Sequence, residues 1–394
     1  MNGKIEKVQT YLKEINIDGW LIYDFRKSNE LAHYFLNIPS HAVTTRRFFY
    51  WIPKEGEPIR LVHAIESQVL DELPGEKWVY LSWQFLEKEL GEILKGKHKI
   101  AMEYSPNNRI PYVSRVDAGT VDLVRSFGVE VVSSADFISY FIAELTDAQI
   151  ESQVRAGIAL DEIVADTWKW IAKNLSENKK ITEYDVQQKI VQDFKDRKMI
   201  TDHNPIVATN AHSADPHYEA LKGKSSEIKM GDFILLDQWA KESTEDAIFA
   251  DITRVGVAGP KPTEKQKEIF EVVRKAQKEA DELVKSRFEK KERVEGREVD
   301  DAARSVIEQA GYGKYFTHRT GHSIERALHG SGAHIDNLEI NDVRPLIPRS
   351  CFSIEPGIYL PGEFGVRLEY DVLILPDGSV KITGGEQDEI TCLF

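Results

Sequence analysis

The segment FILLDQWAKESTEDAIFADITRVGV, residues 233–257, indicates the fold of the second half of the chain. Its first apolar run ends in Asp237, a polar turn follows, and a second apolar run contains Asp251. Two apolar runs joined by a polar turn predict a β-hairpin. If the hairpin is centred on Thr244, Asp237 and Asp251 are direct cross-strand partners with side chains about 5 Å apart. Two like charges that close are unfavourable without a cation.

The same spacing recurs near the C-terminus, around the turn Pro361-Gly362. A hairpin centred on Gly362 pairs Glu355 in the stretch SIEPG with Glu369 in the stretch GVRLE. A single acid on a strand is usually an exposed residue at a sheet edge. Two mirrored pairs, each embedded in apolar strand sequence, instead predict a cation site.

The composition is that of a globular protein with two or three domains. Of the 394 residues, 41% are apolar and 29% charged, and no apolar run approaches the roughly 18 residues of a membrane span. The N-terminus lacks the apolar core of a secretory signal, so a cytoplasmic location is expected. The formal charge of -14 disfavours nucleic acid and anionic membranes as partners.

The two cysteines, Cys351 and Cys392, are too few for a disulfide framework or a cysteine-built metal site. Both are predicted to be buried apolar residues. A metal ion in this chain would therefore be bound by oxygen and imidazole ligands.

Two domains are predicted, residues 1–145 and 146–394. Short apolar strands alternate with amphipathic helices in the first, which indicates an α/β domain. The capping box Thr146-Asp147-Ala148-Gln149 opens a long helix and marks the junction. Predicted strands in the first domain are 19–23, 48–52, 59–62, 78–81, 100–103 and 129–132, and predicted helices are 64–73, 84–95 and 115–127. In the second domain, helices are predicted over 146–175, 182–198 and 298–310 and after Thr263, and strands near 206–211, 233–239 and 248–257.

Histidines concentrate in the second domain, which holds seven of the eleven in the chain. The motif Thr317-His318-Arg319-Thr320-Gly321-His322-Ser323 supplies an imidazole, and Gly321 permits close approach of the backbone. Four carboxylates with one or two neutral imidazoles match the oxygen-rich ligation that a pair of divalent ions requires. His212 and His334 are predicted to be structural.

These residues resemble the pita-bread-fold metallopeptidases, which comprise prolidase, aminopeptidase P and methionine aminopeptidase, with the metal-free creatinase as a relative. The stretches FADITR (249–254), SIEPGIY (353–359) and VRLE (366–369) are close to the family's own motifs. The chain looks like the prolidase and aminopeptidase P branch of this family, because a separate N-terminal domain of creatinase type precedes the catalytic domain. The resemblance implies an α/β N-terminal domain and an α+β pita-bread catalytic domain with a curved, mainly antiparallel sheet.

The resemblance also implies the site. Its five metal ligands correspond to Asp237, Asp251, His322, Glu355 and Glu369, with Asp251 and Glu369 bridging two divalent ions. A metal-bridging hydroxide would attack the peptide bond that precedes proline, and Glu355 would carry the proton to the leaving nitrogen. The further matches are His217 and His318 for substrate binding, His329 for polarising the carbonyl, and Arg367 for orienting a carboxylate or a substrate terminus.

The family likeness implies an enzyme acting on short proline-containing peptides as a homodimer, with manganese as the favoured metal and cobalt, zinc or iron as other candidates. The residues leave open whether it is a dipeptidase or an aminopeptidase. A creatinase-like or other small-molecule hydrolase or lyase, and a non-catalytic binding module, remain alternatives, although no ligand is missing.

Three departures from the family pattern bear on substrate preference. The connection from Asp237 to Asp251 is longer than usual. Gly330 stands where a glutamate commonly follows the second histidine. Glu325 and Arg326 replace small or apolar residues between the two histidines.

Overall fold

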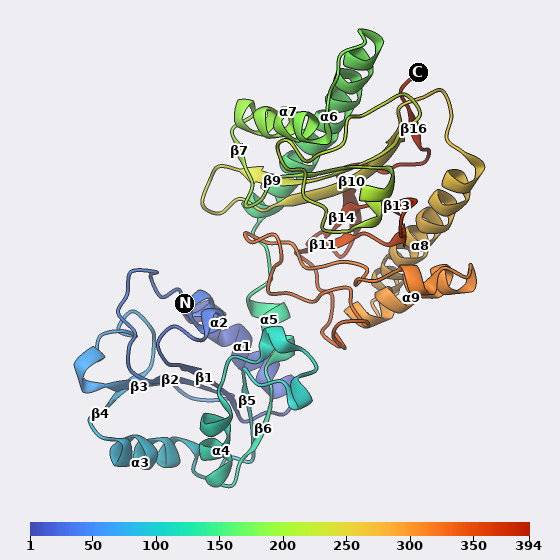
Figure 1. The fold of residues 1–394 in the computed structure, drawn as a ribbon. Coiled ribbons are helices and arrows are strands. Elements are labelled where there is room, and N and C mark those ends of the chain that lie inside the picture. The colour runs from blue at the N-terminus through green and yellow to red at the C-terminus, as the bar shows by residue number, and fades with distance from the viewer. The chain divides into compact units, whose positions relative to one another are not determined.

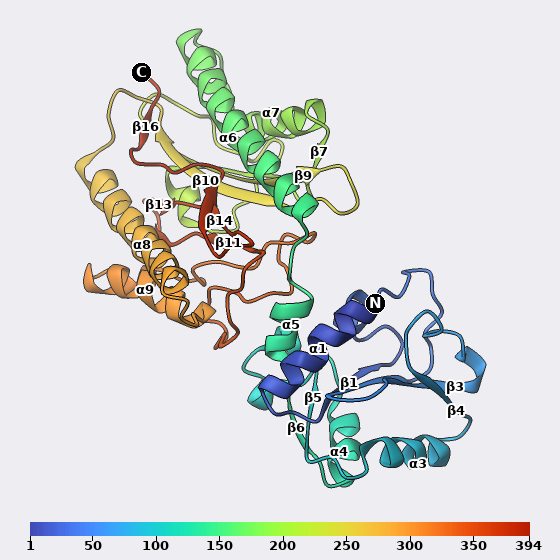
Figure 2. The ribbon, with the colours of Figure 1, turned by 180° about the vertical axis from the view of Figure 1, so that it is seen from behind.

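The computed structural model describes residues 1–394 and divides into two compact units, Met1–Ala143 and Glu144–Phe394. The sequence placed the junction two residues later, between 145 and 146. Figures 1 and 2 show the elements of each unit from opposite sides.

The N-terminal unit is built on one six-stranded sheet in the order β4-β3-β2-β1-β5-β6. Only β2 runs antiparallel to its neighbours. The strands are β1 (Gly19–Asp24), β2 (Phe48–Pro53), β3 (Ile59–His63), β4 (Glu76–Tyr80), β5 (Lys99–Met102) and β6 (Glu130–Ser133). The helices are α1 (Asn2–Glu14), α2 (Glu30–Phe35), α3 (Trp83–Leu94), α4 (Ala118–Ser126) and α5 (Ala135–Phe141).

The helices of this unit depart from the sequence prediction in several ways, and the short helices α2 and α5 were not predicted at all. The sequence missed α1, whose buried Ile5, Val8 and Leu12 lie at helical spacing, because no side chain caps its start. The helix predicted over 64–73 is only the short 3-10 helix η1 (Ala64–Glu66), followed by turns that bond three residues back. There the Glu66 carboxylate accepts backbone hydrogen bonds from Thr45 and Arg46.

The C-terminal unit combines long helices with a mainly antiparallel set of strands, as the sequence indicated. The helices are α6 (Asp147–Ser176), α7 (Glu183–Asp196), α8 (Glu264–Glu289) and α9 (Gly296–Gln309). The strands are β7 (Met199–Ile200), β8 (Ile206–Thr209), β9 (Phe233–Glu242), β10 (Ala250–Val257), β11 (Ser350–Ile354), β12 (Gly357–Leu360), β13 (Phe364–Arg367), β14 (Tyr370–Ile374), β15 (Val380–Thr383) and β16 (Thr391–Cys392). Only the β10–β16 pair is parallel.

Capping explains where the long helices begin. Thr146 and Gln149 form the predicted capping box at the start of α6, and Thr263 and Gln266 form another at the start of α8. Each box satisfies backbone N–H groups that the first helical turn leaves without partners.

The β9–β10 hairpin separates two apolar cores. On one face, Leu235 and Val255 pack into the core that includes α8 and α9. On the other face, Leu236 and Ile252 pack into the core that includes α6 and α7. Because side chains alternate along a strand, Asp237 lies on the same face as Leu235, toward the first of these cores.

The register of this hairpin differs from the prediction. Asp237 pairs with Thr253, and Asp251 pairs with Trp239, so the two acids are not direct partners. The ladder begins only at Ala250, because the buried residues 247–249 before it belong to the turn. The shift leaves both acids on the same face, since each acid lies two residues from the position opposite the other.

The second predicted hairpin has the expected centre. Gly357 pairs with Arg367 in β12–β13, and Ile354 pairs with Tyr370 in β11–β14. Both pairs have Gly362 at their midpoint. Glu355 and Glu369 therefore lie opposite each other at the break between the two ladders, outside regular strand pairing.

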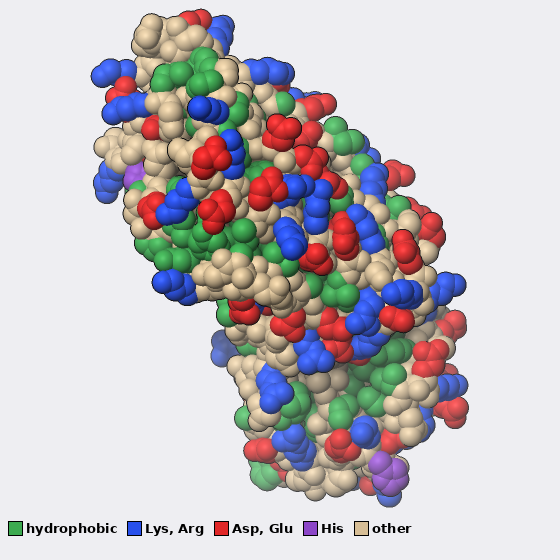
Figure 3. Space-filling model, turned by 90° about the vertical axis from the view of Figure 1, so that its right-hand side faces the viewer, with side chains coloured by type: hydrophobic (Ala, Val, Ile, Leu, Met, Phe, Trp, Pro, Cys, Tyr) green, Lys and Arg blue, Asp and Glu red, His purple; other side chains and the backbone are tan.

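Three observations bear on the composition arguments. No helix of the chain is long and apolar enough to cross a membrane. Acidic and basic side chains are intermixed on the face in Figure 3, without a segregated basic patch there. The prediction for the cysteines is half wrong, because Cys351 is buried but Cys392 is exposed in the short strand β16.

Candidate metal centre

Three buried side chains converge from separate parts of the C-terminal unit. They are Asp251 of β10, His322 of the loop after α9, and Glu369 of the break between β13 and β14. One ligand atom from each lies within 4.8 Å of the others. Asp251 Oδ1 and Glu369 Oε1 are buried and make no hydrogen bond. Since a buried carboxylate oxygen without a partner is costly, the donor set fits a bound cation.

The other two predicted ligands flank this cluster. Asp237 Oδ1 accepts a hydrogen bond from the Thr253 hydroxyl at 2.9 Å, and its Oδ2 accepts one from Arg367. Glu355 Oε1 lies 3.5 Å from His322 Nε2 and accepts a hydrogen bond from the Ser353 hydroxyl at 3.1 Å. The five side chains that the sequence singled out thus lie together.

The tautomer of His322 is fixed by its contacts. Its Nδ1 lies 3.2 Å from the Ser323 carbonyl oxygen, which can only accept, so Nδ1 carries the proton. Burial lowers the His322 pKa well below its ordinary value, so the ring is neutral. Nε2 therefore presents a lone pair to Asp251 Oδ2 at 3.6 Å and to Glu355 Oε1. Acceptors that face one another in a buried space fit a bound cation.

The environment of the carboxylates disfavours their ionised forms and raises their pKa values. Burial raises the pKa of Asp251 well above its ordinary value, and the charges of Glu369 and Asp237 add to the effect. Burial and the charges of Glu355 and Asp237 likewise raise the pKa of Glu369. Burial raises the pKa of Glu355 to about 7. Divalent cations would reverse this effect by stabilising the ionised forms.

A hydrogen-bond network that the sequence did not reveal supports these acids. The Thr253 hydroxyl lies 2.9 Å from Asp237 and 2.7 Å from Glu369, and it accepts from Arg367 Nε at 3.1 Å. The Thr253 hydroxyl has one proton and can donate it to only one of the two carboxylates at a time. Which carboxylate accepts it therefore depends on the protonation of both. The sequence could have indicated Thr253, because this residue lies two positions after Asp251 and therefore on the same face of the strand.

Arg367 and His318 meet at the Tyr359 hydroxyl. This hydroxyl accepts from Arg367 Nη1 at 2.9 Å and donates to His318 Nε2 at 2.7 Å. The His318 Nδ1 proton is directed to the Arg319 carbonyl at 2.7 Å, and burial lowers the His318 pKa to about 3. His318 is therefore neutral and reaches the acids through Tyr359 and Arg367.

The remaining two histidines lie differently. His329 is an exposed residue, and its ring packs edge-on against His322 with ring centroids 4.3 Å apart. Burial lowers the His329 pKa, and the charge of Arg319 acts in the same direction. His217 is exposed and its ring makes no hydrogen bond, so no contact joins it to the acids.

A buried carboxylate holds the segment that carries His217. Glu183, at the start of α7, accepts hydrogen bonds from the Tyr218 hydroxyl at 2.6 Å and the Ser226 N–H at 2.8 Å. It also accepts from the N–H and hydroxyl of Thr209, both at 2.7 Å, and contacts His212 Nδ1 at 2.9 Å. His212 thus has a structural contact, as predicted, whereas no pattern in the sequence indicated a role for Glu183.

Two of the departures from the family pattern lie against each other. Glu325 is half-buried and accepts hydrogen bonds from the Gly332 N–H at 2.8 Å and the Ser323 hydroxyl at 3.0 Å. A Cβ atom on Gly330 would lie only 2.6 Å from Glu325 Oε1. Glu325 therefore buttresses the loop behind His322, and the space that it fills accounts for a glycine at 330. His334, also predicted to be structural, accepts from the Ser323 N–H at 3.1 Å in the same loop.

Residues 145–376 match metallopeptidase family M24. The chain belongs to this family, which confirms the resemblance found in the sequence. An Xaa-Pro dipeptidase of Lactobacillus delbrueckii subsp. lactis is 31% identical over 382 residues, 96% of each chain. An Xaa-Pro dipeptidase of Pyrococcus horikoshii is 36% identical over 185 residues, which is 47% of this chain and 48% of that protein.

Solved structures confirm the two-domain pita-bread fold. Dipeptidase PepE from Mycobacterium ulcerans has a TM-score of 0.68 at 22% identity, covering 100% of this chain and 97% of that one. An X-prolyl aminopeptidase from Caenorhabditis elegans, described as a cytosolic enzyme with a di-nuclear active site, has a TM-score of 0.60 at 16% identity. That match covers 96% of this chain and 61% of that chain.

Proposed function

We propose that the chain is a dinuclear metal-dependent exopeptidase that hydrolyses the peptide bond preceding proline. Asp237, Asp251, His322, Glu355 and Glu369 would hold two divalent ions. The proposal rests above all on the His322 lone pair, which faces Asp251 and Glu355 in a buried space. The buried, unpartnered oxygens of Asp251 and Glu369 support it.

Individual side chains of the site would have separate roles in the proposed hydrolysis. Bound divalent ions would supply Lewis acidity, which lowers the pKa of the attacking water and polarises the scissile carbonyl. Glu355 can hold a proton near neutral pH, because burial raises its pKa to about 7, and would pass it from the water to the leaving nitrogen. His329 lies beside His322 and has a lowered pKa, and it would donate a hydrogen bond to the carbonyl oxygen.

The substrate groups would be bound at the edge of this site. His217 is exposed in a segment fixed by Glu183, so its ring can meet a peptide without rearrangement of the loop. Arg367 would orient Asp237, or meet a substrate terminus, and His318 would hold Arg367 through Tyr359.

The finer assignments have different supports. Relatives named Xaa-Pro dipeptidase favour short proline-containing peptides as substrates. Four carboxylates with one imidazole suit manganese best, with cobalt, zinc or iron also possible. A homodimer remains our expectation from the family resemblance, and the structural neighbour described as a cytosolic enzyme supports a cytoplasmic location.

The test is hydrolysis by the Mn²⁺-reconstituted protein of three peptides, Ala-Pro, Ala-Pro-Ala and Ala-Ala-Ala. We expect cleavage of at least one of the first two, and which one is cleaved separates a dipeptidase from an aminopeptidase. Cleavage of the third alone would reject the proline assignment. Hydrolysis of none of the three would favour a small-molecule hydrolase on the same fold.

Paired variants test the ligand assignment. His322→Ala and Glu355→Ala should abolish turnover while the protein stays folded. Their controls are His203→Ala and Glu363→Ala, which remove an exposed histidine and an exposed glutamate of the same unit and should leave turnover unchanged. Full activity in either ligand variant would exclude the proposed mechanism.

A further inference from the structure

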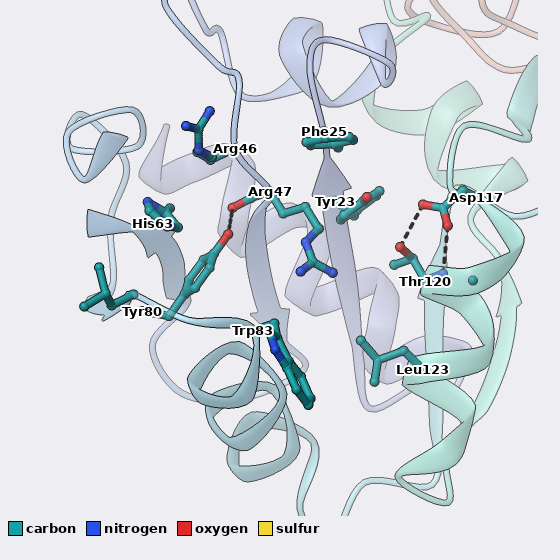
Figure 4. A pocket seen from close by; sticks show the side chains of 12 residues that line it. Tyr23, Phe25, Arg46, Arg47, His63, Tyr80, Trp83, Asp117, Thr120 and Leu123 are labelled. Atoms are coloured by element: carbon teal, nitrogen blue, oxygen red, sulfur yellow. Dashed lines mark hydrogen bonds between the residues drawn. The ribbon is translucent and has the colours of Figure 1, made fainter. Parts of the chain in front are cut away.

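A cavity of about 700 Å³ opens in the N-terminal unit, and every residue that lines it belongs to that unit. Figure 4 shows its side chains, which include two arginines and several aromatic rings. We propose that this cavity binds a small molecule that carries a planar ring and an anionic group. The site is separate from the metal centre and does not depend on the proposed peptidase activity.

The position of the cavity follows from the topology of the sheet. Tyr23, His63 and Tyr80 lie at or next to the carboxyl ends of the parallel strands β1, β3 and β4. From β1 the chain adds β2, β3 and β4 on one side, and it then returns to add β5 and β6 on the other. Open α/β sheets bind ligands at the carboxyl ends of their strands, where the strand order changes direction in this way.

The charge of the cavity favours an anion. The Arg47 guanidinium is half-buried and makes no hydrogen bond, since only its backbone carbonyl is used, by the Tyr80 hydroxyl at 2.7 Å. The one carboxylate in the lining, Asp117, already accepts from the N–H and hydroxyl of Thr120 at 2.9 and 2.7 Å. Arg46 adds a second guanidinium at the rim. A planar guanidinium without an acceptor suits a carboxylate or phosphate, which it can bind through two hydrogen bonds.

The walls favour a flat ring. Phe25 is 42% exposed and Trp83 59% exposed, which is unusual for side chains of this size. Figure 4 shows Arg47 reaching into the space between Tyr23 and Trp83, so that a ring stacked on Trp83 would bring its anionic substituent to the guanidinium. A volume of about 700 Å³ is ample for an aromatic acid or a nucleoside monophosphate.

The test uses the full-length protein and two probes that share this chemistry but differ in source, adenosine 5′-monophosphate and indole-3-acetate. Binding is measured by isothermal titration calorimetry, with adenosine and inorganic phosphate as probes that lack one of the two features. We expect at least one complete probe to bind saturably, and at least about tenfold more tightly than either incomplete one. Absence of saturable binding by both complete probes would overturn the proposal.

Four variants locate the binding. Arg47→Gln and Trp83→Ala should each weaken the probe by about tenfold or more. Arg109→Gln and Phe85→Ala remove an exposed arginine and an exposed aromatic outside the lining, and they should bind as the unaltered protein does. Thermal unfolding checks that each variant is folded. Equal binding by Arg47→Gln and the unaltered protein would mean that the probe lies elsewhere, such as at the metal ligands, and would also overturn the proposal.

Discussion

Gly321 precedes the ligand His322 and lies where two backbone segments meet closely. A Cβ atom at this position would be only 2.0 Å from the Ser353 carbonyl oxygen. Gly321 also exchanges two backbone hydrogen bonds with Ile335, at 3.2 and 3.0 Å. We therefore predict that Gly321→Ala forces the segments apart and moves His322 with them.

The size of the effect follows from these contacts. To reach an ordinary separation the two segments must part by more than about 1 Å, because heavy atoms do not approach much closer than roughly 3 Å. That movement would break the backbone bonds that join the two segments, from the Ser353 N–H to the His322 carbonyl and from the Glu355 N–H to the Thr320 carbonyl, at about 1 kcal/mol each, and overpacking adds roughly 1 kcal/mol or more. The free energy of unfolding of the C-terminal unit should fall by roughly 2 to 4 kcal/mol. Displacement of His322 should weaken metal affinity by about 10 to 100-fold.

The assay combines urea unfolding of the metal-free protein with calorimetric titration of Mn²⁺. Gly259→Ala is the matched control, since Gly259 is buried in the same unit but its nearest neighbour to a new Cβ lies at 3.8 Å. The control should show little change in either measurement. If Gly321→Ala retained both the unfolding midpoint and the Mn²⁺ affinity, the argument from close backbone approach would be wrong.

Three further predictions concern buried polar groups outside the ligand set. Thr253→Val removes the hydroxyl that is shared by Asp237 and Glu369 and contacted by Arg367. The free energy of unfolding in urea should fall by roughly 2 kcal/mol for the metal-free protein and by less with Mn²⁺ bound. Equal losses with and without Mn²⁺ would contradict the role of this hydroxyl between the two carboxylates. Glu183→Gln should raise KM for Ala-Pro or Ala-Pro-Ala by about tenfold with a smaller change in kcat, since it loosens the His217 segment; an unchanged KM would refute this. Burial raises the pKa of Glu103 from 4.5 to about 7, so the folded state binds more protons than the unfolded one between these values. Stability of the N-terminal unit should therefore fall by about 3 kcal/mol as pH rises through that window, and Glu103→Gln should flatten the dependence measured by urea unfolding at pH 4 to 8.

The mirrored spacing of the acids predicted both hairpins correctly, but it predicted the strand register correctly only for the hairpin centred on Gly362. The turn at Gly362 is short, so counting outward from it gives the observed pairs. The β9–β10 connection is irregular, and its buried residues 247–249 resemble strand sequence although they precede the ladder. Spacing therefore predicted that Asp237 and Asp251 share a face, while their exact partners depended on turn geometry that spacing does not encode.

The four acids among the proposed metal ligands could be singled out because each lies in or beside apolar strand sequence, where the cost of a buried carboxylate requires an explanation. His322 was added by its likeness to the family motif. The supporting groups could not be singled out. Thr253, Tyr359 and Glu183 are residue types found on any surface, and only the folded chain brings them to the site. The likeness to family motifs added the substrate histidines, but the compensation between Glu325 and Gly330 required coordinates.

The break between the two C-terminal ladders has a consequence for synthesis of the protein. Asp237 and Asp251 leave the ribosome on one hairpin long before Glu355 and Glu369 exist. Until Glu355 and Glu369 have been synthesised, Asp237 and Asp251 have no glutamates opposite them and stay exposed to water. A partly synthesised chain is thus expected to be inert toward peptides around it, because the hydrolytic machinery can assemble only as translation nears completion.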